Sequence, residues 1–206
     1  MSAQLEAPKL HKERSLVLLK PDAVQRALIG EITKRLEATG LKLTGLKLMV
    51  ATREQVFAHY NKDDAWFERK GKNIVEELKQ MGAPVEKEAI EYGRDIIEQM
   101  ADFMTAGPLV AMVIEGNMAT QVVVKMTGST EPATADIGTI RGDLTIDSYG
   151  HAAYRSSGVR NLIHCSESPE EAEREIKIWF TDEEVIKYST VWEKILYDVN
   201  LDGILE

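Results

Sequence analysis

The chain has 206 residues, with 25 basic and 34 acidic side chains and a formal net charge of −9. A domain of this length can bury a self-sufficient core, so it requires neither a disulfide framework nor a structural metal. Its 44% apolar and 29% charged residues are ordinary globular values, which exclude a mainly disordered chain. The net acidity argues against nucleic-acid binding through bulk charge.

The single cysteine, Cys165, excludes an intramolecular disulfide and fits a reducing compartment. No apolar run approaches the roughly 18 residues of a transmembrane helix. Residues 1–14 also lack the apolar stretch of a secretory signal. We therefore predict a cytoplasmic protein with no membrane partner.

The charge is unevenly distributed along the chain. Residues 1–60 hold 10 basic and 6 acidic side chains, whereas residues 167–206 hold 4 and 12. An anion-binding site in this chain must therefore use a few well-placed cations, most of them from the first part of the sequence.

The first strand and helix can be read from their apolar spacing. Residues 15–19 are a short apolar run that predicts a buried strand, which Pro21 ends. Apolar residues then recur at every fourth position and predict one amphipathic helix, which Gly40 ends. These positions are Val24, Leu28, Ile32 and Leu36.

Residues 41–50 predict a second strand, with a bulge where the apolar parity changes at Gly45. The pair Thr52 and Gln55 has the spacing of a capping box and predicts a short helix. Residues 66–104 have the pattern of a helical hairpin that breaks at Gly82-Ala83-Pro84. Its two apolar stripes are Ile74, Leu78, Met81 and Ile96, Met100, Phe103.

The second half begins with a predicted central strand at 109–114 and a helix at 118–126. Residues 127–160 predict a long loop with short helical pieces, a length that is unusual unless the loop is functional. Residues 161–164 predict the last strand. Capping signals at Ser168 and Thr181 predict two further helices.

This order of elements favours an α+β protein of the ferredoxin-like, split β-α-β type. We expect a four-stranded antiparallel sheet with surrounding helices. We also expect a single domain over residues 1–206. It would carry a helical insertion at about 68–100 and a loop insertion at about 148–158.

Common nucleotide-binding loops and metal motifs are absent from the sequence, so any phosphate site must be built from side chains. Among the histidines, His164 stands at the end of the last strand, just before a strongly capped helix. Glu175 on that helix could bond one imidazole nitrogen and leave the other free as a nucleophile.

Two cations are candidates for phosphate contacts. Arg141 lies beside Gly142 in the long loop and could bind phosphate in a bidentate manner. Alternatively, it forms an ordinary loop ion pair with Asp143. Lys20, at the end of a buried strand, either projects a point charge into a cleft or simply marks the strand exit.

Taken together, these segments resemble the nucleoside diphosphate kinase family. The similarity rests on ordered motifs that cover roughly 13–60, 103–143 and 160–190. They are Leu18–Arg26 followed by Gly30–Ile32, His59–Tyr60, Gly107–Val113, Gly128–Pro132, Gly138–Asp143, Arg160–Ser168, Ala172–Ile176 and Trp179–Phe180.

The resemblance implies a ping-pong transfer of the γ-phosphate of a nucleoside triphosphate to a nucleoside diphosphate, with phosphohistidine at His164. It implies roles for further residues by motif position. Lys20 and Arg141 would neutralise phosphate, Thr130 would donate a hydrogen bond to it, and Asn161 would contact the sugar. Tyr60 would shape the wall, and Ser166 and Glu175 would hold the His164 ring.

The resemblance also implies partners. The base would stack on an aromatic ring, either Trp66 or Phe67, although both could instead belong to the core. Mg²⁺ would arrive on the nucleotide's phosphates, with no metal ligand from the protein. The family forms hexamers or tetramers of dimers, so we expect a homo-oligomer.

Three departures from the family pattern stand out. Val124 occupies the position of a phosphate-contacting arginine, with Lys125 beside it, and Cys165 occupies the position of a glycine. The two insertions are the third departure. They leave a rival hypothesis, a catalytically degenerate member that binds nucleotides or acts as a scaffold.

Overall fold

The computed structural model describes residues 12–80, 82–155 and 157–196. Four strands form one antiparallel sheet in the order β2-β3-β1-β4. They are β1 (Lys12–Leu19), β2 (Lys42–Val50), β3 (Pro108–Asn117) and β4 (Ile163–Cys165). The predicted α+β, ferredoxin-like architecture is therefore confirmed.

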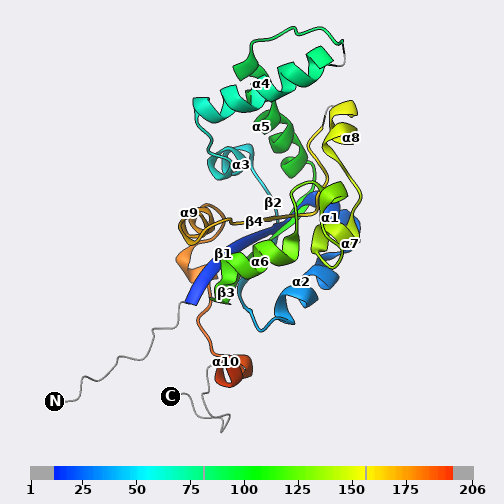
Figure 1. The fold of residues 1–206 in the computed structure, drawn as a ribbon. Helices are drawn as coiled ribbons and strands as arrows, with labels where there is room; N and C mark the ends of the chain where they lie inside the picture. Colours follow the sequence, from blue (N-terminus) through cyan, green and yellow to red (C-terminus); the bar gives the residue numbers. More distant parts are fainter. Residues whose placement is uncertain (1–11, 81, 156, 197–206) are drawn as a thin grey trace, which may run out of the picture.

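The two faces of the sheet carry separate cores because successive residues of β1 point to opposite sides. Val17 and Leu19 pack with α1 (Pro21–Gln25), α2 (Ile29–Glu37) and α6 (Ala119–Thr127). Leu16 and Leu18 pack with α3 (Arg53–His59), α5 (Ala89–Thr105) and α9 (Pro169–Trp179). Figure 1 shows β1 running between these two helical layers. All four of these side chains are fully buried, as expected of a central strand.

The predicted bulge in β2 is confirmed. Its register against β3 shifts between Leu43 and Gly45. Gly45 lies so close to Phe180 that an added Cβ would be 3.0 Å from the ring. The absence of a side chain there lets the end of α9 pack directly onto the strand.

The prediction of one continuous helix after β1 was wrong. The segment forms α1 (Pro21–Gln25) and α2 (Ile29–Glu37), separated at Ala27, which has a left-handed φ of +55°. The Leu28 amide donates to Ala23 and the Ala27 amide to Val24, which is the Schellman pattern of a helix end. Alanine occupies the place where glycine is usual, so no residue in the sequence signals the break.

The hairpin that follows β2 is confirmed, with wider limits than predicted. After α3 (Arg53–His59), which the Thr52 capping box begins, come α4 (Asp64–Gln80) and α5 (Ala89–Thr105). Figure 1 shows α4 and the start of α5 standing away from the sheet. The helices touch backbone to backbone, because an added Cβ at Gly93 would lie 2.1 Å from the Phe67 carbonyl oxygen.

Two faces of α5 are covered. The stripe Ile96, Met100 and Phe103 is only half-buried, whereas the fully buried stripe is Gly93, Ile97, Ala101 and Met104. An added Cβ at Gly158 would lie 3.6 Å from Met100 and 3.9 Å from Phe103. The helical hairpin and the segment around Gly158 therefore meet at this half-buried stripe. The predicted stripe residue Met81 lies outside the described residues.

The predicted long loop contains only short helical pieces. After α6 (Ala119–Thr127) come a 3₁₀ turn at Pro132–Thr134, α7 (Ile140–Leu144) and α8 (Tyr149–Tyr154). The last strand, β4, begins two residues later and ends one residue later than predicted. Helix α9 (Pro169–Trp179) begins as predicted at Ser168, whose hydroxyl accepts the Glu171 amide at 3.2 Å.

The helix predicted from Thr181 was wrong in extent. Its capping box forms, but only one 3₁₀ turn, Asp182–Glu184, follows before the chain extends. The Ile186 amide then donates to the Thr44 carbonyl at 2.8 Å, so pairing with β2 replaces the helix. The segment ends in α10 (Val191–Leu196). No helix within the described ranges is long and apolar enough to cross a membrane.

Candidate active site

His164 projects from β4 toward the α9 side of the sheet. It pairs with Leu18 of β1, and Leu18 belongs to the core formed with α3, α5 and α9. The flanking residues Ile163 and Cys165 point to the other core. The side chain of His164 retains 17% exposure, so an edge of the ring is open to a substrate.

A hydrogen-bond chain fixes the orientation of this ring. The Leu16 amide donates to Ser166 Oγ at 3.2 Å, so the Ser166 hydroxyl donates onward to Glu175 Oε2 at 2.7 Å. His164 Nε2 lies 3.1 Å from the same carboxylate oxygen. Because a carboxylate accepts, Nε2 carries the proton and Nδ1 keeps a free lone pair.

His59 forms the back of the site. Trp179 Nε1 donates to His59 Nδ1 at 3.2 Å, which places the proton of the neutral ring on Nε2. The ring meets His164 edge to face, with centroids 4.3 Å apart, and the Tyr60 ring lies 6.2 Å from His164. Sequence reasoning used His59 only as a landmark and assigned it no role in the site.

Arg174 joins α3 to α9 behind the site. Its guanidinium donates to the Ala58 carbonyl at 3.0 Å and to the His59 carbonyl at 3.1 Å. It also lies 3.6 Å from Glu175 Oε1. Arg174 therefore holds the end of α3, and with it Tyr60, against the helix that carries Glu175.

Burial dominates the electrostatics of the imidazoles. It lowers the pKa of His164 to about 3, with Lys20 as the next cause. It also lowers the pKa of His59 well below its ordinary value, and it raises the pKa of Glu175. His164 is therefore neutral at pH 7, which is the protonation state that a nucleophile requires.

Three predicted residues form a second chain of contacts. Lys20 Nζ donates to Asn161 Oδ1, and Asn161 Nδ2 donates to the Thr130 carbonyl, both at 2.8 Å. Burial, followed by the charge of Arg141, lowers the pKa of Lys20 to about 8. The structure therefore brings together three places in the chain: the residue after β1, the long loop, and the residues just before β4.

Arg141 does not form the alternative ion pair with Asp143. Asp143 instead pairs with Arg35 at 2.7 Å. The Arg141 guanidinium donates to the carbonyls of Gly128, Asn161 and Ile163 at 2.9, 3.2 and 2.6 Å. These bonds occupy three of its five donors and hold it buried beside Lys20.

Leu162 stores backbone strain at the centre of the site. Its φ is +67°, in the left-handed region that non-glycine residues rarely adopt. Its amide donates to Asp22 at 3.1 Å and its carbonyl accepts from the Lys20 amide at 2.8 Å. These two bonds tie the left-handed turn before β4 to the residues that follow β1.

Cys165 fits its strand without such strain, because its φ is not positive. Burial raises the pKa of its thiol. The cysteine therefore causes no backbone problem where the family pattern has glycine, and its thiol is in a poor state for nucleophilic chemistry.

Two further pairs of residues named in the sequence analysis make no contact with His164 among the described residues. Trp66 and Phe67 lie in the first turn of α4, with ring centroids 5.5 Å apart. Val124 and Lys125 are both exposed on α6. The structure does not choose between Trp66 and Phe67 as the stacking ring.

Among the described residues, one group could hold a metal ion: His59, His164 and Glu175, whose donor atoms lie within 4.8 Å of one another. Two imidazoles and one carboxylate suit zinc, whereas magnesium prefers an oxygen shell. This donor set is therefore poorly suited to hold magnesium directly.

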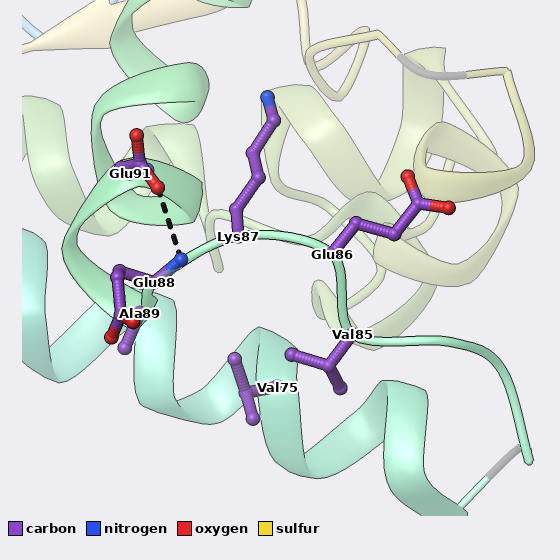
Figure 2. Close-up of a pocket in the computed structure, with 7 residues that line it drawn as sticks. All are labelled: Val75, Val85, Glu86, Lys87, Glu88, Ala89 and Glu91. Carbon is purple, nitrogen blue, oxygen red and sulfur yellow. Dashed lines mark hydrogen bonds between the residues drawn. The ribbon is translucent and has the colours of Figure 1, made fainter.

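A surface hollow lies between α4 and the segment that leads into α5. Figure 2 shows Val75 and Val85 facing one another there, while Lys87 points away. Its lining includes three glutamates, among them Glu88 and Glu91. Such an acidic lining is unsuited to a polyphosphate, so the hollow is not the substrate site.

Comparisons with known proteins agree with this geometry. The family model described as nucleoside diphosphate kinase matches residues 13–97 and 65–185. A nucleoside diphosphate kinase of Pyrobaculum aerophilum is 43% identical over 180 residues, which cover 85% of this chain and 98% of the relative.

Solved structures show the same similarity. The crystal structure of an NDP kinase from Pyrobaculum aerophilum has a TM-score of 0.80 and 40% identity, covering 85% of this chain and all of that one. A transition-state mimic of the Borrelia burgdorferi enzyme, with bound vanadate and ADP, has a TM-score of 0.74 and 29% identity. It covers 90% of this chain and 96% of the other.

The fold, the site and these similarities define a phosphotransferase. Both kinds of comparison point to the same enzymes, and the matches span β1 to the end of α9. The chain belongs to the nucleoside diphosphate kinase family.

Proposed function

We propose that the chain moves the γ-phosphate of a nucleoside triphosphate to a nucleoside diphosphate through a phosphohistidine at His164. The observation that carries the proposal is the bond from His164 Nε2 to Glu175, which leaves Nδ1 unprotonated at the open edge of the ring. A neutral imidazole with one free lone pair can attack phosphorus directly.

Two displacements complete the cycle. In the first, Nδ1 forms a bond to the γ-phosphorus, the bond from that phosphorus to the β,γ-bridging oxygen breaks, and the nucleoside diphosphate leaves. In the second, a terminal oxygen of the acceptor diphosphate attacks, and the phosphorus–nitrogen bond breaks. Separating the steps lets one site serve donor and acceptor in turn.

The surrounding side chains neutralise and position the phosphates. Lys20 and Arg141 supply buried positive charge, and Thr130 donates a hydrogen bond from the exposed loop beside them. Asn161 contacts the sugar, and Tyr60 forms the wall near the transferring phosphate. Support comes from the contacts that bring Lys20, Asn161 and Thr130 together.

Bound with the nucleotide, magnesium would supply charge neutralisation at the phosphate oxygens beside Lys20 and Arg141. Either Trp66 or Phe67 stacks on the base. Such stacking accepts every base, because every base has a π-face. Alanine variants of each, tested with purine and pyrimidine substrates, identify the ring.

We also infer a homo-oligomer built from dimers. Leu46, Leu48 and Val50 are exposed on the outer strand β2, at 54%, 63% and 60%. An outer strand with a row of apolar side chains is a natural place for a second chain. Light scattering measures the molar mass in solution, and the mass of a monomer would contradict the inference.

The decisive experiment is incubation with ATP radiolabelled at the γ-phosphate, followed by acid treatment. The expected product is an acid-labile phosphoprotein that passes its label to added GDP and is absent from His164→Ala. Val124→Arg is assayed beside the wild type to learn whether the missing arginine limits the rate. Nucleotide binding without labelling would favour a degenerate, scaffold role instead.

A further inference from the structure

The two cations predicted for this site each bond protein oxygens with some of their donors. Lys20 donates to Asn161, and Arg141 donates to three backbone carbonyls. The position where the family pattern has a further arginine is Val124, which is apolar and exposed. A further cation near His164 would therefore add to the positive charge that Lys20 and Arg141 offer a triphosphate.

Lys62 is placed to supply that charge. It follows the end of α3, three residues after His59 and two after Tyr60. Consecutive Cα atoms are about 3.8 Å apart, so the Lys62 backbone lies within roughly 8 Å of that of Tyr60. The rings of His59 and Tyr60 lie against His164, so Lys62 directly follows the residues that line the reacting ring.

The charge of Lys62 reaches the reacting group. It acts on His164 together with those of Lys20 and Arg141, and it also acts on Glu175. The residue is partly buried, yet no hydrogen bond or ion pair joins it to another part of the described chain. A partly buried lysine with no protein partner has its ammonium donors available for an anion.

The end of α3 is rigidly held, which fixes where Lys62 begins. Arg174 bonds the carbonyls of Ala58 and His59, and Trp179 bonds the His59 ring. The α3–α4 connection therefore starts from a fixed point beside the catalytic imidazole, whereas the lysine stem itself is free to adjust to a ligand.

We propose that Lys62 is a phosphate-binding residue, which contacts the terminal phosphates of the nucleotide beside His164. The proposal rests on the phosphotransfer function proposed above. A lysine suits this position because its ammonium is a compact charge on a flexible stem, able to follow the phosphoryl group between nucleotide and histidine. Its ligand is a nucleoside di- or triphosphate, and a monophosphate is too short to engage it.

The test compares Lys62→Met with Lys62→Arg, and uses Lys79→Met as a control because Lys79 is an exposed lysine in the last turn of α4. Calorimetry measures binding of ATP, ADP and AMP to the full chain with magnesium. We expect Lys62→Met to bind ATP and ADP roughly tenfold more weakly, as for a lost charge-assisted bond. AMP binding stays unchanged, and Lys62→Arg restores most of the affinity for ATP and ADP.

Two outcomes would overturn this role: unchanged ATP and ADP affinity in Lys62→Met, or an equal loss for AMP, which would indicate a merely structural effect. Circular dichroism confirms that each variant folds. The radiolabelling assay reports separately on His164. A wild-type chain that binds ATP through Lys62 but forms no phosphohistidine would refute the proposed function and leave the Lys62 contact standing.

Discussion

Glu175 and His164 are eleven residues apart, and they meet through a 3.1 Å contact between Oε2 and Nε2. The carboxylate is buried, and Ser166 donates to the same oxygen. Glu175 therefore does not act as a base toward solvent. It determines that Nε2 carries the proton and that Nδ1 keeps its lone pair.

Replacing Glu175 with glutamine tests this assignment. The charged partner of Nε2 is lost, which costs about 1.5–3 kcal/mol for a hydrogen bond to a charged group. We expect the rate of His164 phosphorylation to fall by roughly 10- to 100-fold. Rapid-quench labelling with ATP measures it. Glu173→Gln on the same helix, whose partner is Arg14 on the molecular surface, serves as control and should label normally.

The low pKa of His164 has a consequence for stability. An unfolded histidine titrates near pH 6.5, whereas burial brings the pKa of His164 in the folded chain to about 3. Between these values the unfolded state binds more protons, so the free energy of unfolding falls as the pH falls from about 6.5 to 3. Burial lowers the pKa of His59 as well, so His59 adds to the same loss of stability at low pH.

His164→Asn should therefore lose less stability than the wild type between pH 7 and pH 4. Urea unfolding at pH 7, 5.5 and 4 gives the three free energies of unfolding. His59 remains in both proteins, so the difference between them isolates His164. Parallel curves would show that His164 is not held neutral in the folded chain.

The lowered pKa of Lys20 predicts that catalytic activity declines at alkaline pH. Burial and Arg141 lower the pKa of its ammonium to about 8, so the positive charge is present below this pH and is lost above it. We expect kcat/KM for ATP to decline above about pH 8, because this ratio reports ionisations of the free enzyme. In Lys20→Arg the decline should move beyond the measurable range. An identical decline in both proteins would assign it to another group.

The sequence predicted the location of His164 because local signals coincide around it. The apolar run before it predicted a strand, and the Ser168 cap fixed the start of the helix that brings Glu175 back. Both signals depend on near neighbours in the chain. The same holds for the bulge at Gly45 and the glycine break between α4 and α5, which were also predicted.

Other features of the site depend on contacts between distant segments. The three carbonyls that hold Arg141 and the pairing of Asp143 with Arg35 have no local signature. The left-handed φ of Leu162 is imposed by bonds to Asp22 and Lys20 from another part of the chain. The prediction of a helix after Thr181 failed for a similar reason, because the chain beyond Glu184 bonds to β2 through the Ile186 amide.

The glycine crossing of α4 and α5 predicts a strong steric effect. An added Cβ at Gly93 would meet the Phe67 carbonyl at 2.1 Å, where backbone cannot easily yield. We expect Gly93→Ala to destabilise the chain by about 1–3 kcal/mol, the usual cost of overpacking. Differential scanning calorimetry measures the loss.

Gly30→Ala in α2 is the matched control for Gly93→Ala, because an added Cβ at Gly30 meets nothing within 4 Å. Alanine also has the higher helix propensity, so Gly30→Ala should be neutral or slightly stabilising. If Gly93→Ala were as stable as Gly30→Ala, the close backbone approach of the two helices would be incorrect.

Asp147 anchors the segment over residues 148–160. Its carboxylate accepts from both terminal nitrogens of Arg155, at 3.1 and 2.8 Å, and from the Arg160 amide at 2.7 Å. These bonds hold the pKa of Asp147 below its ordinary range, although burial acts in the opposite direction. Asp147 therefore ties α8 to the segment that enters the active site.

Asp147→Asn removes the charge and cannot accept at both oxygen positions. We expect amide hydrogen exchange to accelerate in α8 and at Arg160, because their local opening no longer breaks charge-assisted bonds. Hydrogen-exchange mass spectrometry measures the change. Asp136→Asn, an exposed residue of the long loop, is the control. Since Arg160 adjoins Asn161, the KM for nucleotides should also rise in Asp147→Asn. Unchanged exchange over 148–160 would show that the insertion is held by other contacts, such as the approach of Gly158 to α5.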